Sequence, residues 1–382
     1  MKIYGKLFLD SYAQDPRMKQ PKHRSPVTGK SRSFNLYEFH NDLPIFKFFH
    51  QKSIETVGWI KIKNSFADPD SKCDCDINLL VDVIEYPKAL EPVSREMNAP
   101  LVMCSIDIEA ISKDGGFPNP NHEGSEVIVI GMSFSRLGKC IYHRCSIVLG
   151  DCTVADDDLI VYRCNSEENV LLTFSRVMRD MLPDCVTGWN TFGFDDQFLF
   201  KRADFNGILD EFCDLGKVRG WRSNLIRKNR SSSAMGDNML EILKIPGCIN
   251  RDAMSEVKND FMRKEASYKL DDIAAKYLNH RKLPMSYETI MKFKSLDMIT
   301  RGKIVEYCSR DADLPLMLDE KFSYTFNDIE MAKTASIPLQ YIYLRGQGVK
   351  TYSLMVQFCT QRDIVIPNLT HDKSIKAQYE GS

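Results

Sequence analysis

The chain has 382 residues, of which 43% are apolar and 27% charged, a balance typical of folded globular domains. Its formal net charge is −1 at pH 7, so nucleic acid cannot be held through overall positive charge alone. The longest apolar runs, such as residues 127–132, are far shorter than a membrane span of about 18 residues, which argues against a membrane protein. At roughly 100–200 residues per domain, this length predicts two or three domains.

The first 100 residues alternate short apolar runs with polar stretches and predict a smaller, mixed α+β domain. Within them, residues 16–37 are basic without an acidic side chain and contain Pro and Gly. We interpret this segment as an exposed loop, and an arm that contacts phosphates is the alternative. The pair Cys73 and Cys75 lacks further ligands at the spacing that a metal site needs. The scattered cysteines predict reduced, buried thiols of an intracellular protein, as at Cys104, Cys140, Cys308 and Cys359.

From about residue 100 onward the hydrophobic pattern becomes regular. It predicts strands at 101–110, 127–134, 138–142 and 186–189. Helices are predicted at 165–182 (with Asn165 or Ser166 as the N-cap), 195–204, 268–278 and 302–322. The segment 222–238 is basic and then Ser-rich, which predicts a loop. Strands followed by helices indicate an α/β domain with a mixed sheet.

The first candidate site is the pair Asp107 and Glu109 in the strand at 101–110. Residues two apart on a strand share a face, so both carboxylates point the same way while Ile106 and Ile108 enter the opposite layer. Adjacent carboxylates repel unless a cation lies between them, and Mg²⁺ prefers such oxygen ligands. The alternative is a strand end that carries two solvated acids.

Two further segments place a carboxylate where it could join the first pair. In the segment 187–195, a strand ends in a turn and Asp195 begins the next helix, although acids are common at helix starts. Tyr307 and Asp311 are four residues apart on a helix and therefore share a face. The alternative for this last pair is an exposed acid beside a packed tyrosine.

The three candidate segments follow one another as Asp-x-Glu, Asn-x-x-x-Phe-Asp and Tyr-x-x-x-Asp. In this order they resemble the 3′–5′ exonuclease motifs of family B DNA polymerases. The segments 98–109 and 115–120 are similar to the first exonuclease block of delta-type members, and 187–195 is similar to the second. The resemblance covers roughly residues 85–380 and is closest to delta-like polymerases of large DNA viruses. Other similar segments are 231–238, 245–247, 267–274 and 345–350.

The resemblance implies a ribonuclease H-like exonuclease domain at 101–330, with a mixed sheet flanked by helices. It also implies that residues 1–100 form an N-terminal domain that is completed by about 331–382. The apolar residues between 337 and 358 fit this expectation, because a tail of that length cannot bury them alone.

The resemblance further assigns roles to single residues. Two Mg²⁺ ions, replaceable by Mn²⁺, are expected on the carboxylates of Asp107, Glu109, Asp195 and Asp311. Tyr307 is expected to orient the attacking water, because a phenol with an ordinary pKa near 10 is a poor base. Asn190 and Phe194 are expected to hold the 3′ end of single-stranded DNA. Family members often carry a Ser/Thr-Leu pair that contacts the end of the DNA strand. Ala253 and Met254 stand in its place here, so we do not assign this contact to the chain.

The palm motifs Asp-x-x-Ser-Leu-Tyr-Pro and Tyr-Gly-Asp-Thr-Asp do not occur in this sequence. We therefore expect the N-terminal portion of a longer replicative polymerase, acting on primer–template DNA with a processivity factor and without a membrane. Its expected location is intracellular, in the nucleus or at a viral replication site. A stand-alone exonuclease and an inactive nucleic-acid-binding module are the alternatives.

Overall fold

The computed structural model describes residues 22–24, 31–33, 44–83, 85–86, 88–232, 236–260, 262–280 and 285–362. The chain divides into two compact units. The first comprises Met1–Ile62, Pro87–Ser94 and Met331–Ser382, and the second comprises Lys63–Tyr86 and Arg95–Glu330. Residues 63–86 therefore group with the second unit, although the sequence favoured the N-terminal domain.

The second unit is built on a six-stranded sheet in the order β10-β9-β8-β7-β11-β14. Strands β7, β8 and β9 follow one another antiparallel, whereas β10, β11 and β14 run parallel to their neighbours. The predicted mixed sheet of an α/β fold is thus confirmed. The strands are β7 (Val102–Ser112), β8 (Ser125–Arg136), β9 (Ile141–Leu149), β10 (Ile160–Cys164), β11 (Cys185–Gly188) and β14 (Ile249–Asn250).

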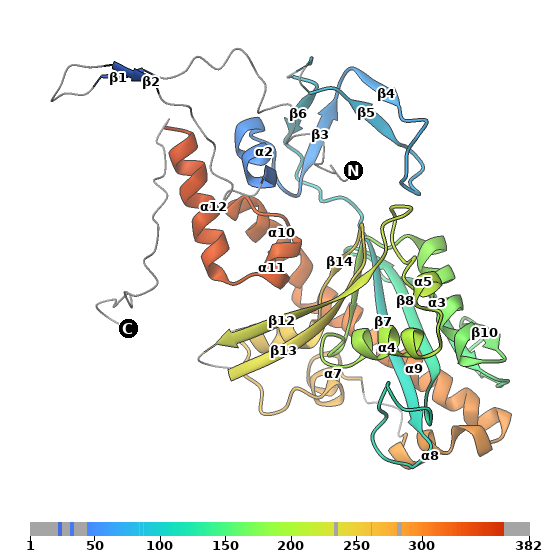
Figure 1. Ribbon diagram of the computed structural model, residues 1–382. Coiled ribbons are helices and arrows are strands. Elements are labelled where there is room, and N and C mark those ends of the chain that lie inside the picture. Colours follow the sequence, from blue (N-terminus) through green and yellow to red (C-terminus); the bar gives the residue numbers. More distant parts are fainter. Residues whose placement is uncertain are drawn as a thin grey trace. The chain divides into compact units, whose positions relative to one another are not determined.

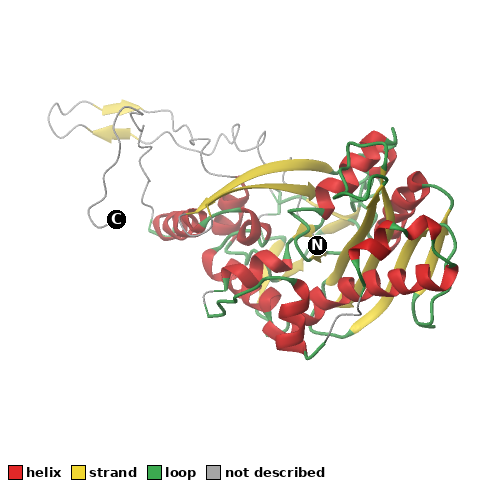
Figure 2. Cartoon of the chain, turned by 90° about the horizontal axis from the view of Figure 1, so that it is seen from below, coloured by secondary structure: helices red, strands yellow, loops and turns green. Residues whose placement is uncertain are grey.

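Helices cover both faces of this sheet (Figure 1 and Figure 2). On one face, Ile106 and Ile108 join a core with helices α3, α4 and α5. On the other face, Val129 and Val148 pack against α8, η2 and α9. The bounds are α3 (Glu167–Met181), α4 (Asp195–Phe205), α5 (Leu209–Phe212), α6 (Ala253–Asn259), α7 (Leu270–Leu278), α8 (Tyr287–Met291), η2 (Phe293–Ser295) and α9 (Met298–Phe322). The N-cap of α3 is Ser166, which is one of the two residues that the sequence predicts for this position.

Two sequence predictions in this unit are wrong. The strand expected at 138–142 begins only at Ile141, because Gly138 has a left-handed φ of 71° and forms a turn. The loop expected at 222–238 is instead a hairpin of β12 (Asn224–Ser232) and β13 (Gly236–Lys244), which projects beyond the sheet (Figure 1). Its basic residues have strand partners: Arg227 lies opposite Glu241 and forms an ion pair of 2.7 Å. A second antiparallel pair, β4 (Ser65–Ala67) and β5 (Leu79–Val81), also belongs to this unit.

The first unit gathers segments from both ends of the chain. Thr56 Oγ1 donates to the carbonyl of Ala332 at 3.1 Å, and the hydroxyl of Ser353 lies 3.2 Å from Nε2 of His50. Its elements are β1 (Lys22–Arg24), β2 (Ser31–Ser33), α2 (Pro44–Lys52), β3 (Trp59–Ile62), β6 (Leu90–Val93), α11 (Gln340–Leu344) and α12 (Gln347–Thr360), with α10 (Tyr324–Ala335) leading into it. Apart from β1 and β2, the basic segment 16–37 lies outside the described residues.

We expect a chain that ends at residue 330 to aggregate and to unfold at a lower temperature than the full chain. It lacks Ile337 and Val356, which are buried in the first unit, and it exposes the apolar surface that they cover. Size-exclusion chromatography and thermal unfolding of both chains measure this effect. A monomeric 1–330 chain with an unchanged melting temperature would show that the tail covers nothing. Not all of the expected apolar stripe contributes, because Leu354 and Phe358 are 42% and 52% exposed.

All twelve cysteines are described, and all carry free thiols. Cys104 and Cys308 are buried as expected, whereas Cys140 is exposed and Cys359 is half-buried. Among the helices that the structure describes, none combines the length and the apolar character of a membrane span.

Candidate active site

The first two carboxylates come from the central strand β7. Asp107 and Glu109 lie opposite Gly131 and Val129 of β8, on the sheet face that α9 covers. The intervening Ile108 is buried in the core on the other face. Both carboxylates are half-buried, so they remain accessible from solvent at the edge of the α9 interface.

The next two residues come from α9, which runs along the same face of the sheet. Tyr307 and Asp311 are one helical turn apart, and both are buried. Between them, Cys308 donates its thiol hydrogen to the carbonyl oxygen of Asp107 at 3.3 Å. A Cβ atom on Gly131 would lie 2.7 Å from the carbonyl oxygen of Cys308, so the backbones of α9 and β8 meet there without a side chain between them. This close approach brings α9 within reach of the β7 carboxylates.

Asp107, Glu109 and Asp311 form a group whose ligand oxygens all lie within 4.8 Å of one another. At that separation and an effective dielectric constant of about 20, two unit charges repel by roughly 3 kcal/mol. A divalent cation among the three carboxylates would offset this repulsion. Hard oxygen donors of this kind suit Mg²⁺ or Mn²⁺, so the residues present fit a divalent ion.

Asp195 lies outside that group, although the sequence placed it in the same metal cage. It is buried at the start of α4, and the backbone amide of Ile108, the residue between Asp107 and Glu109, lies near enough to its carboxylate to act on its pKa. That amide is accessible to Asp195 because β11 ends at Gly188, opposite Ile106. Burial, reinforced by the nearby Asp252 carboxylate, raises the pKa of Asp195 to about 7.

Burial and the charges of the three carboxylates act on the pKa of the Tyr307 phenol. Burial raises its pKa far above the ordinary value, and the charges of Asp311, Glu109 and Asp107 raise it further. The hydroxyl therefore keeps its proton at any physiological pH and can donate a hydrogen bond.

The turn between β11 and α4 carries the two residues expected to contact DNA. Asn190 has a left-handed φ of 64°, and its carbonyl accepts the amides of Gly193 and Phe194 at 2.9 and 3.1 Å. The ring of Phe194 meets that of Phe117 edge-to-face with centroids 5.4 Å apart, and it also packs against Phe198. Phe117 is 76% exposed, so this ring pair continues from the core to the surface.

Sequence reasoning missed a buried ion pair that supports the Phe117 loop. Arg202 on α4 is 2% exposed and pairs with Glu167 of α3 at 2.6 Å. Its Nη1 also donates to the carbonyls of Pro120 and His122 in the loop that joins β7 to β8. Nothing in the sequence marks either residue, because acids and bases at these helix positions are usually solvated.

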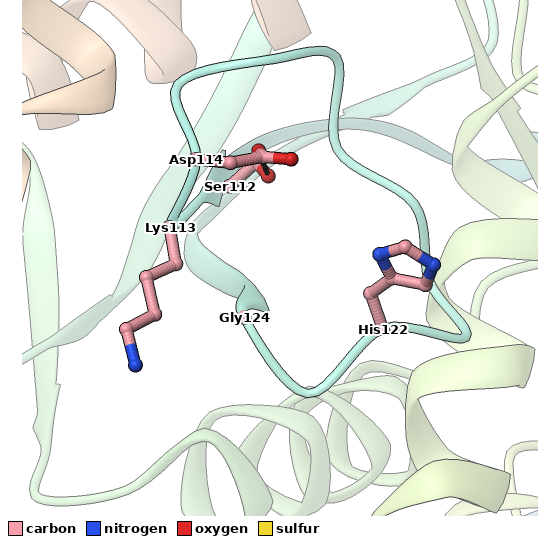
Figure 3. Close-up of a pocket in the computed structure, with 5 residues that line it drawn as sticks. All are labelled: Ser112, Lys113, Asp114, His122 and Gly124. Carbon is pink, nitrogen blue, oxygen red and sulfur yellow. Dashed lines mark hydrogen bonds between the residues drawn. The ribbon is translucent and has the colours of Figure 1, made fainter.

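The same loop borders an open pocket of about 300 Å³ that contains none of the expected site residues. It is lined by Ser112, Lys113, Asp114, His122 and Gly124. Figure 3 shows Lys113 and His122 on opposite sides of the loop and Asp114 beside Ser112, whose hydroxyl donates to the Asp114 carboxylate. The carboxylate group, rather than this pocket, is the candidate centre for chemistry.

Residues 36–273 match the model of the exonuclease domain of DNA polymerase family B. This chain belongs to that family. The family B match ends before Tyr307 and Asp311, so the place of these two residues in the site rests on the geometry of α9.

The relatives of this family B chain are themselves polymerases. It is 27% identical over 357 residues to the DNA polymerase delta catalytic subunit of Oryza sativa subsp. japonica, covering 92% of this chain and 32% of the relative. A DNA polymerase of Paramecium bursaria Chlorella virus NY2A is 26% identical over 357 residues, covering 91% and 38%. The delta catalytic subunit of Candida albicans is 28% identical over 329 residues, covering 84% and 30%. The chain thus spans about a third of the length of these relatives.

Proposed function

We propose that this chain is a 3′–5′ exonuclease that hydrolyses the terminal nucleotides of single-stranded DNA in a proofreading role. The observation that carries the proposal is the group of three carboxylates, contributed by β7 and α9, in a family B exonuclease domain. The chain has no separate cluster of this kind among the residues that the structure describes.

The carboxylates of Asp107, Glu109 and Asp311 would hold divalent ions, Mg²⁺ or Mn²⁺, and Asp195 would complete the set. When bound, a pair of such ions activates water and stabilises the leaving oxygen of a phosphodiester. The carboxylate of Asp195 lies near the backbone amide of Ile108, the residue between the two β7 ligands, which supports its assignment to the same set. A nearby cation would favour its charged form and so oppose the effect of burial.

Tyr307 supports the proposal because it supplies a proton donor and no negative charge. Its pKa is raised by burial and by the three carboxylates, so the phenol cannot act as a general base. We assign it the orientation of the attacking water by a hydrogen bond. Its place one turn from Asp311 puts the phenol on the same face of α9 as the Asp311 carboxylate.

We assign the terminal nucleotides to the turn at Asn190 and Phe194. A side-chain amide can bond to sugar or phosphate, and an aromatic ring can stack on any base, so these contacts need no particular sequence. The Phe194 ring already meets the exposed Phe117, which extends the apolar surface available to a base.

We infer the wider setting from the relatives. The chain would be part of a replicative DNA polymerase that binds primer–template DNA and works with a processivity factor. Such a protein would act in the nucleus or at a viral replication site. A delta-like polymerase of a large DNA virus fits the similarity to both the delta catalytic subunits and the chlorella virus polymerase.

Cleavage of single-stranded DNA should need a divalent cation. With a 5′-labelled oligonucleotide and Mg²⁺, we expect a ladder of products shortened from the 3′ end, and chelation should lower the rate by about 100-fold or more. A 3′-labelled copy should release its label in the first step, which tests the direction. Cleavage that survives chelation would rule out the metal-dependent mechanism.

A further inference from the structure

A buried aspartate links the turn at Asn190 to a helix that takes no part in the proposed chemistry. Asp252 is 2% exposed and is the N-cap of α6. One of its oxygens accepts the backbone amide of Ser255 at 3.0 Å, as an N-cap normally does. The other accepts the backbone amide of Phe192 at 3.1 Å, across 60 residues of chain.

Two more backbone amides, those of Asn190 and Met254, lie near this carboxylate and act to lower its pKa. Asp252 therefore faces amides of its own helix and of the turn between β11 and α4, and it accepts a hydrogen bond from one of each, Ser255 and Phe192. A carboxylate has about four acceptor positions and no donor, so it can serve both groups of amides at once. An ordinary N-cap needs only the amides of its own helix.

The arrangement is costly, which argues that it serves more than helix capping. Burial raises the pKa of Asp252 above its usual value, although the four amides counteract this effect. Asp195 and Asp196 are buried close by, and the Asp252 charge raises the pKa of both. A serine in this position would cap α6 without adding a charge to the group.

The amides that Asp252 holds lie at the start of the turn that leads to Asp195. Asn190 has a left-handed φ of 64°, a conformation that asparagine tolerates better than most residues, and it reverses the chain at this point. From Asn190 the chain makes one tight turn and enters α4 at Asp195. The direction of this turn therefore depends on where Asp252 fixes its first amides.

We propose that Asp252 is a positioning residue, which holds the turn so that Asn190, Phe194 and Asp195 meet the 3′ end of the DNA correctly. This inference rests on the nuclease function proposed above. It gives Asp252 no contact with DNA or with a metal ion.

The variant Asp252→Ser separates the two roles, because serine caps a helix about as well as aspartate but is too short to reach the turn. We expect the concentration of a 5′-labelled single-stranded oligothymidylate that gives half the maximal cleavage rate to rise about fivefold, and the maximal rate to fall about tenfold. Loss of folded protein alone would lower the maximal rate and leave the half-saturating concentration unchanged. The matched control is Asp297→Ser, since Asp297 caps α9 through Ile299 and Thr300 of its own helix.

Hydrogen–deuterium exchange of the free protein supplies a readout that does not depend on cleavage. We expect faster exchange in residues 189–195 of Asp252→Ser, with unchanged exchange in β7 and α6. If Asp252→Ser does not fold, Asp252→Asn, which keeps one acceptor oxygen and nearly the same volume, is measured in the same way. Unchanged exchange in the turn and an unchanged half-saturating concentration would overturn the proposal. If the wild-type chain does not cleave DNA, the nuclease function fails, and the exchange measurement still decides whether Asp252 holds the turn.

Discussion

Replacing Asp107 and Glu109 together by alanine is expected to abolish cleavage of single-stranded DNA and to leave the chain folded. The two side chains supply two of the three clustered ligand oxygens, so a divalent ion would retain only Asp311 from that group. Because the pair repels itself in the metal-free protein, its removal should leave the free energy of unfolding unchanged or raise it by about 1 kcal/mol.

Metal binding provides a second measurement on the same variant. Mg²⁺ or Mn²⁺ that binds only the folded state should raise the melting temperature of the wild-type chain, and this rise should disappear in the double variant. The matched control replaces Asp157 and Asp158, two exposed neighbouring acids that are not members of the carboxylate group, and should keep both activity and the metal-dependent shift. A double variant that melts well below the wild type would mean that Asp107 and Glu109 stabilise the fold instead.

Gly131→Ala should strongly impair the nuclease although it changes no carboxylate or other polar side chain. The added methyl would lie 2.7 Å from the carbonyl oxygen of Cys308, so α9 must move away from the sheet. Overpacking of this kind costs about 1–3 kcal/mol of folding free energy. A shift of about 1 Å between the α9 and β7 ligands should lower the cleavage rate on the order of 100-fold.

The control for this effect is Gly348→Ala, since no atom lies within 4 Å of a Cβ at that position in α12. Alanine favours a helix over glycine, so we expect unchanged activity and a slightly higher melting temperature. If Gly131→Ala cleaves DNA at the wild-type rate, the close contact between α9 and β8 does not set the geometry of the site.

Local periodicity explains which parts of the site could be predicted. Asp107 and Glu109 share a face because strands have a period of two, and Tyr307 and Asp311 share one because four residues nearly complete a helical turn. The two pairs come together because α9 packs directly on the backbone of β8 at Gly131, which has no side chain. No local sequence pattern shows this contact. The family resemblance supplied the pairing that periodicity could not.

The features that the sequence did not reveal depend on contacts between distant segments. The segment 222–238 has the composition of a loop, but Ile242 and Leu243 of β13 are 1% exposed and anchor a hairpin there. Asp195 has the position of an ordinary helix-start acid, yet it is buried near Asp252 of a distant segment. The roles of Arg202 and Asp252 likewise follow from carbonyls and amides far away in the chain.

The hydrogen bond between His50 and Ser353 spans 303 residues, which has a consequence for synthesis on the ribosome. At about 5–20 residues per second, α2 is translated some 15–60 s before α12 exists. During that interval the buried side of Phe48 in α2 has no partner from the C-terminal segment. The apolar side of α2 is therefore expected to stay uncovered by the C-terminal segment in the nascent chain while the nuclease sheet folds. We expect chaperones that bind apolar segments to bind the nascent chain at α2.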